Sequence, residues 1–142
     1  MILIDVNILV YAKRQDAADH LKYRFWLEET LRSNTIVGLS DVVLSGVIRI
    51  LTHPRIYRDP THPDEALEYV NYLRTETGCI VASPGDHHWE IFTRLCNSSG
   101  AKGNLVSDAF HAALAIESGA EWITADRDYA RFPGLRWRHP LA

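Results

Sequence analysis

The stretch ILIDVN at residues 2–7 decides the fold. Its apolar start predicts a short buried strand over Ile2–Val6, with Asp5 near the end of that strand. An aspartate in a buried strand costs free energy unless it is paired or binds a metal, but at the carboxyl end of a strand it can project into a cleft. Asn7 lies two positions further on and faces the same way as Asp5 if the strand is regular. A simpler interpretation is that both residues end the strand and begin a turn.

Strand-like runs alternate with helical patterns along the rest of the chain. The predicted strands are Ile2–Val6, Thr35–Leu39, Cys79–Ala82, Glu121–Thr124 and a short fifth run at Arg136–Arg138. The predicted helices are Asp16–Ser33, a helix capped by Ser40 or Asp41 that ends near Leu51, Pro63–Thr77, Asp86–Asn97 and Asp108–Ser118. This alternation implies parallel pairing with helices on both faces of the sheet. We therefore predict one α/β domain over residues 1–142, with a three-layer α/β/α architecture and a central parallel sheet of four or five strands.

The amino-acid composition excludes several classes of protein. The chain has 142 residues, of which 46% are apolar, and its formal net charge is −3. This is not the strongly basic balance of a protein that binds nucleic acid by bulk electrostatics, although a local basic patch is compatible with it. Cys79 and Cys96 show neither metal spacing nor a disulfide framework. With no signal peptide and no apolar run as long as a membrane span, we expect a cytoplasmic protein that does not enter a membrane.

Asp108 opens the apolar stretch DAFHAALAI at residues 108–116. It shares a helical stripe with Ala112 and Ala115, so its carboxylate is expected to point towards the core side of the helix. With Ser107 as the cap, the positive end of the helix would favour a charge there, and this alone is a sufficient structural role. We interpret Asp108 as a metal ligand. His111, three residues further on, is interpreted as packing near the site.

A second acidic pair follows the fourth predicted strand, in TADRD at residues 124–128. Thr124 and Asp126 point the same way if the strand continues, and Asp126 and Asp128 then face one site from the strand end and the following turn. Thr124 is placed to bond a ligand carboxylate. The alternative is that Asp126 caps a short helix containing Tyr129, and for Asp128 this structural role is nearly as good an explanation.

No single acid is specific, but their joint placement is informative. In α/β proteins the carboxyl ends of parallel strands gather along one edge of the sheet, where ligands bind. Carboxylates brought together there repel one another unless a cation neutralises them, and hard divalent cations choose oxygen ligands. The pattern predicts a metal-dependent enzyme that acts on phosphate esters.

The whole chain resembles the PIN domain, and within it the VapC toxins of bacterial toxin–antitoxin pairs. The resemblance rests on ILIDVN at 2–7, IRILTHPR at 48–55, GNLVSDA at 103–109 and ITADRDYARFPGL at 123–135. It implies a ribonuclease that binds Mg²⁺ or Mn²⁺, a cognate VapB-type antitoxin as inhibitor, and a homodimer. It places metal binding and catalysis on Asp5, Asp108 and Asp126. Asp128, Thr124 and Asn7 would support them.

One position departs from the family pattern. PIN domains of this kind commonly carry a glutamate in the helix after the second strand, a few residues before an arginine. Here Gly46 stands at about that point, and Asp41, the nearest acid, is five residues earlier and is interpreted as a helix cap. The second metal position is therefore in doubt, and the site is expected to hold one ion firmly and to recruit another only with RNA.

The expected reaction is hydrolysis of RNA without use of the ribose 2′-hydroxyl, which leaves 5′-phosphate and 3′-hydroxyl ends. Arg49 and Arg127 are the main candidates for phosphate contact, within a larger set of exposed cations. Two other interpretations stay open. One is a catalytically impaired PIN-like domain that binds RNA or protein. The other is a Mg²⁺-dependent phosphatase with an aspartyl nucleophile, although Asn7 stands where such enzymes usually place a second aspartate.

Overall fold

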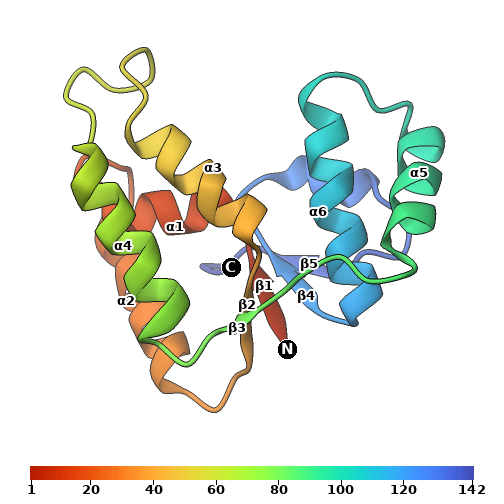
Figure 1. Cartoon of the computed structure of the whole chain (residues 1–142), viewed down its shortest axis with the longest axis horizontal. Coiled ribbons are helices and arrows are strands. Elements are labelled where there is room, and N and C mark those ends of the chain that lie inside the picture. Colours follow the sequence, from red (N-terminus) through yellow and green to blue (C-terminus); the bar gives the residue numbers. More distant parts are fainter.

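A computed structural model describes all residues 1–142 and shows a five-stranded, fully parallel sheet (Figure 1). The strand order is β3-β2-β1-β4-β5. The strands are β1 (Ile2–Ile4), β2 (Val37–Leu39), β3 (Ile80–Val81), β4 (Glu121–Ile123) and β5 (Trp137–Arg138). The predicted α/β class, the parallel pairing and the short fifth strand are confirmed.

Six α-helices and one 3-10 helix connect the strands. They are α1 (Val6–Lys13), α2 (His20–Arg32), α3 (Asp41–Leu51), α4 (Pro63–Thr75), α5 (His88–Ser99), α6 (Asn104–Ser118) and the 3-10 helix η1 (Arg127–Arg131). The chain moves from β1 towards β3 through α1–α4 and then returns to β4 through α5 and α6, as the strand order requires. Right-handed crossovers in opposite directions place these two groups on opposite faces of the sheet, and Figure 1 shows them on either side of it. None of the helices is long and apolar enough to cross a membrane.

The central strand β1 is buried on both faces. Ile2, Leu3 and Ile4 are all inaccessible, as are Trp122 and Ile123 of the neighbouring β4. A strand covered by helices on both sides has no solvent face and reads as a continuous apolar run rather than an alternating one. The carboxyl ends of β1 and β4 therefore emerge together from a rigid, dry core.

The chain after Asp5 differs from the prediction, because the strand ends at Ile4 and α1 begins at Val6. Asp5 makes this break: its Oδ1 accepts a hydrogen bond from the Val6 amide at 2.7 Å and caps the helix. Helix α1 was not predicted, since its consecutive buried residues (Ile8, Leu9, Val10) carry no amphipathic pattern. Asn7 thus lies in the first turn of a helix, not on a strand.

Four other helices have corrected boundaries, and one of them, α5, spans His88–Ser99 instead of the predicted Asp86–Asn97. Helix α2 begins at His20 instead of Asp16, because Asp19 before it has a left-handed backbone with φ 58°. Helix α4 ends at Thr75, two residues before the predicted Thr77. Helix α6 begins at Asn104, directly after Gly103, whose φ of 56° and ψ of −127° suit only glycine. Asp108 therefore stands in the second turn of α6, and Ser107 is not its cap.

Candidate active site

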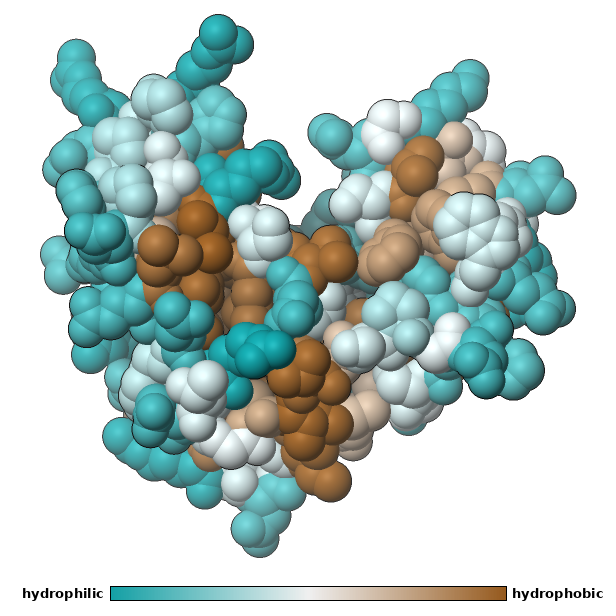
Figure 2. Space-filling model, in the orientation of Figure 1, coloured by the Kyte–Doolittle hydropathy of each residue, from teal (hydrophilic) through white to brown (hydrophobic).

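The candidate site lies where the topology of the sheet reverses. From β1 the chain turns to one face and from β4 to the other, so a crevice opens between the carboxyl ends of these two strands. Figure 2 shows the surface hollowed between the group α1–α4 and the group α5–α6. The register pairs Ile4 with Ile123, and the Asp5 amide donates to the Ile123 carbonyl at 2.9 Å. The residues after β1 and β4 are thereby held side by side.

Asp5 is the most constrained acid of this crevice. It is 6% exposed, and its Oδ2 accepts a hydrogen bond from the Thr124 hydroxyl at 2.6 Å and another from the Asn7 amide at 3.2 Å. Burial raises the pKa of Asp5 to about 6, and the charges of Asp108 and Asp126 add to the rise, against the hydrogen bonds from Thr124 and Val6. The carboxylate is held in place by these hydrogen bonds, and no Lys, Arg or His side chain forms an ion pair with it.

Thr124 and Asn7 form the brace between the two strand ends. The fully buried Thr124 hydroxyl donates to Asp5 and accepts from the Asp126 amide at 3.0 Å and the Asn7 side chain at 3.3 Å. The Asn7 Oδ1 accepts from the Ala125 amide at 3.3 Å. The sequence predicts that Asn7 faces the same way as Asp5 and that Thr124 bonds a ligand carboxylate. In the structure both side chains bond Asp5, although Asn7 lies on helix α1 and not on a strand.

Asp108 reaches the crevice from α6. Its Oδ1 accepts a hydrogen bond from the Tyr129 hydroxyl at 3.2 Å. Partial burial raises the pKa of Asp108, with smaller contributions from the charges of Asp126 and Asp128, while the Tyr129 bond opposes the rise. Sequence reasoning missed Tyr129 as a site residue. Its only signal was an aromatic residue three positions after Asp126, which also fits ordinary core packing.

Asp126 and Asp128 differ in what surrounds them. Asp126 caps η1, because its Oδ1 accepts from the Asp128 amide at 2.9 Å. Asp126 therefore caps a short helix, as the alternative interpretation expects, and it also lies in the crevice. Asp128 is exposed and lies 3.5 Å from Arg131 Nη2, an i,i+3 ion pair. Its charge still contributes to the raised pKa of Asp108.

The donor set suits a hard divalent cation. Three carboxylates with neutral oxygen and amide groups around them are the ligand chemistry of Mg²⁺ and Mn²⁺, and the mutual repulsion visible in the pKa of Asp5 is the kind that a cation relieves. The carboxylates nevertheless stand apart as they are placed here. No group of three His, Cys, Asp or Glu side chains in the chain is arranged closely enough to hold a metal ion.

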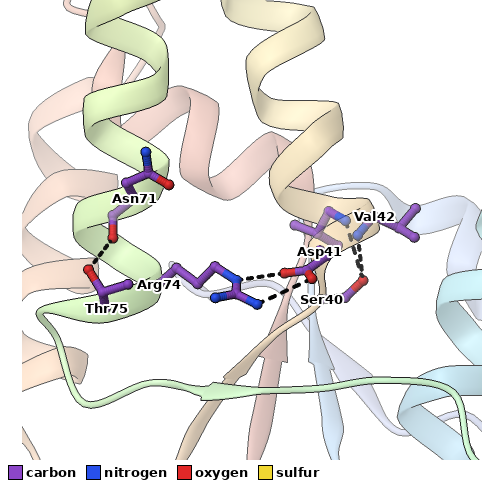
Figure 3. A network of polar contacts seen from close by, with 7 residues as sticks. Ser40, Asp41, Val42, Asn71, Arg74 and Thr75 are labelled. Atoms are coloured by element: carbon purple, nitrogen blue, oxygen red, sulfur yellow. Dashed lines mark hydrogen bonds and ion pairs between the residues drawn. The ribbon is translucent and has the colours of Figure 1, made fainter.

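Gly46 and Asp41 do not supply a fourth acid. A Cβ at Gly46 would lie 3.0 Å from Val6 Cγ2, so α3 crosses the start of α1 closely at this point. Asp41 is the first residue of α3, and Ser40 is the cap, bonded by the Val42 amide at 3.1 Å. Figure 3 shows the Asp41 carboxylate facing Arg74 of α4, which binds it through two nitrogens at 2.8 and 3.3 Å.

The predicted phosphate contacts lie on α3 and on η1, the 3-10 helix that follows β4. Arg49 is exposed on α3, Arg127 is exposed at the start of η1, and neither has a hydrogen-bond or ion-pair partner. His111 is buried, with its ring stacked on Trp122 at a centroid distance of 5.4 Å. Burial lowers the pKa of His111 to about 4, so it stays neutral at pH 7 and serves packing.

Comparison with known proteins agrees with this fold and these motifs. The family model described as the PIN domain matches residues 2–135. The chain is 43% identical over 141 residues to ribonuclease VapC43 of Mycobacterium tuberculosis, covering 99% of this chain and 96% of the relative. It is 31% identical over 140 residues to ribonuclease VapC25 of the same species, covering 99% of each. The solved structure of VapBC-1 from nontypeable Haemophilus influenzae superposes with a TM-score of 0.72 at 18% identity, covering 100% of both chains. The chain therefore belongs to the PIN-domain family and, within it, to the VapC group.

Proposed function

We propose that this protein is an endoribonuclease that depends on Mg²⁺ or Mn²⁺ and acts as the toxin of a toxin–antitoxin pair. The observation that supports the proposal is that Asp5, Asp108 and Asp126 lie around the switch point of the sheet, close enough for the charges of Asp108 and Asp126 to raise the pKa of Asp5. Thr124 bonds two of these residues directly, through the Asp5 carboxylate and the Asp126 amide. The PIN-domain match over residues 2–135 and the VapC relatives support the same activity.

In this proposal Asp5, Asp108 and Asp126 hold the cation, with Asp128 as a supporting acid. A bound divalent cation supplies charge neutralisation, polarisation of the phosphate and a more acidic water. The residues of the chain orient the donors. The Val6 amide and the Thr124 hydroxyl fix both oxygens of Asp5, and the Asp128 amide fixes Oδ1 of Asp126. Because Gly46 adds no carboxylate, one ion is held firmly.

The RNA lies in the crevice between the two helical groups, with Arg49 of α3 and Arg127 of η1 in contact with its phosphates. Four arginines and one aspartate follow Asp126, so this segment is locally basic although the whole chain has a net charge of −3. Hydrolysis by water leaves a 5′-phosphate and a 3′-hydroxyl. In this proposal water is the nucleophile, and the ribose 2′-hydroxyl takes no part.

The proposed partners besides RNA are a VapB-type antitoxin and a second copy of this chain. The support for the antitoxin is membership of the VapC group together with the structural match to VapBC-1. An antitoxin segment with a basic side chain would neutralise the carboxylates that otherwise bind the metal ion. The homodimer rests on the family resemblance alone.

The test is cleavage of total cellular RNA by the purified full chain with Mg²⁺, with Mn²⁺ and with EDTA. Asp5→Ala and Asp108→Ala should each lose cleavage, whereas Asp86→Ala, an exposed acid away from the crevice, should keep it. Discrete fragments with 5′-phosphate ends, formed only with metal, are the expected result. A 2′,3′-cyclic phosphate product formed in EDTA would contradict the proposal.

The close contact between Gly46 and Val6 favours one alternative, a PIN-like domain that mainly binds RNA or protein. Such a domain lacks the carboxylate that would complete a second cation position. Metal affinity and turnover separate the two functions. Under the alternative, Asp5→Ala leaves RNA binding unchanged and there is no metal-dependent cleavage to lose.

A further inference from the structure

Tyr129 connects the segment after β4 to helix α6 at the crevice. Its hydroxyl donates to Asp108 Oδ1 at 3.2 Å, and the side chain is 1% exposed. The ring packs against Trp122, at a centroid distance of 5.5 Å, and Phe132, at 5.8 Å. A buried ring packed against two aromatic neighbours holds its hydroxyl at one position, because little rotamer freedom is left to it.

The three acids differ in how they are oriented. The Asp5 carboxylate accepts three hydrogen bonds, from Val6, Asn7 and Thr124. Asp126 accepts one, from the Asp128 amide to Oδ1. Asp108 stands in the second turn of α6, beyond the free amides of the helix start, and the Tyr129 hydroxyl is its single hydrogen-bond partner. Oδ2 of Asp108 is left without a bond.

The 3-10 helix η1 thus serves two acids at once. Asp126 caps its start, and Tyr129 in its middle reaches across to Asp108. We propose that the Tyr129 hydroxyl is a positioning group, which sets the Asp108 carboxylate so that its free Oδ2 faces the cation site while Asp126 is set by the same turn. Groups that orient a ligand carboxylate typically change metal affinity by about 10- to 100-fold when removed. This inference rests on the cation-dependent function proposed above.

The test is Mn²⁺ affinity of the full chain, measured by the loss of the free Mn²⁺ electron paramagnetic resonance signal. Tyr129→Phe keeps the ring and removes only the hydroxyl, and we expect Mn²⁺ binding about tenfold weaker than in the wild type. Tyr69→Phe is the matched control, because the Tyr69 hydroxyl donates to the Leu9 carbonyl at 2.7 Å and touches no acid. Thermal unfolding without metal is recorded for each protein.

A positioning role predicts that Tyr129→Phe loses Mn²⁺ affinity while Tyr69→Phe lowers only the unfolding temperature. A purely structural role for Tyr129 would shift the unfolding temperature and leave the Mn²⁺ affinity at the wild-type value, and that result would overturn this inference alone. Wild-type protein that binds no Mn²⁺ would overturn the proposed cation site and this inference with it.

Discussion

Thr124 donates a hydrogen bond of 2.6 Å to Asp5, a residue 119 positions earlier in the chain. The contact joins the ends of two adjacent parallel strands, β1 and β4, at the point where the topology of the sheet reverses. The same hydroxyl accepts from the Asp126 amide and the Asn7 side chain. One buried threonine therefore relates the acid after the first strand to the acid after the fourth.

Replacing Thr124 tests this relationship. Thr124→Val keeps the shape but removes the hydroxyl, which leaves Asp5 short of a donor and the Asp126 amide without its acceptor. We expect the free energy of unfolding to fall by about 1–3 kcal/mol and RNA cleavage to fall with it. Thr124→Ser retains the hydroxyl and should retain most of both. Urea unfolding and cleavage assays of the pair decide the question, and equal losses in the two variants would assign the effect to packing instead.

Asp5 makes the stability of the metal-free protein depend on pH. Its pKa is raised from 3.8 to about 6, so between these pH values the folded protein holds a proton that the unfolded chain has released. The free energy of unfolding then falls as the pH rises from about 4 to about 6 and is level above, a loss of about 3 kcal/mol from this group.

Urea unfolding in EDTA at pH values from 4 to 7 measures this effect in wild type and Asp5→Asn. The wild type should lose stability relative to Asp5→Asn as the pH rises, because the other acids titrate in both proteins. Mn²⁺ at pH 7 should stabilise the wild type and leave Asp5→Asn unchanged. Parallel pH profiles of the two proteins would show that Asp5 ionises freely in the crevice.

The exposed cations Arg49 and Arg127 should contribute to RNA affinity through phosphate contact. In EDTA, where cleavage is blocked, Arg49→Gln and Arg127→Gln should each weaken binding of single-stranded RNA. Each should also reduce the slope of log affinity against log salt by about 0.7. Arg32→Gln is the matched control, since Arg32 is exposed on α2 and paired with Glu29 at 3.2 Å. Binding measured from low to high salt gives the slopes, and an unchanged slope removes that arginine from the interface.

The number of bound ions can be changed at Gly46. Gly46→Glu alone should be destabilising, because a Cβ there lies 3.0 Å from Val6 Cγ2. With Val6→Ala to make room, the added carboxylate should raise the Mn²⁺ stoichiometry from one to two in a calorimetric titration. The isosteric Val6→Ala/Gly46→Gln variant carries no charge and should bind one ion. Equal stoichiometry in the two double variants would show that this position does not face the cation.

The sheet and the positions of the three acids around its switch point followed from local patterns, whereas the orientation of the acids did not. Asp5, Asp108 and Asp126 were recognisable because each stands beside an apolar run whose end the parallel topology brings to one edge. The start of α6 was misjudged because Ser107-Asp108 has the composition of a helix start, while the actual start depends on the backbone of Gly103. The Tyr129 contact joins η1 to α6, and no regular spacing of residues along the chain predicts such a contact.

The position of β1 in the middle of the sheet has a consequence for synthesis. The first strand to be synthesised, β1, pairs with β4, which is synthesised much later. Asp5 likewise obtains its hydrogen bond from Thr124 only after β4 has been made. Every nascent chain that lacks β4 therefore lacks the proposed cation site, whatever the state of its first helices. Under the proposed function the nascent chain is inactive until β4 and Thr124 have been added, and the antitoxin is needed only from that point of synthesis onward.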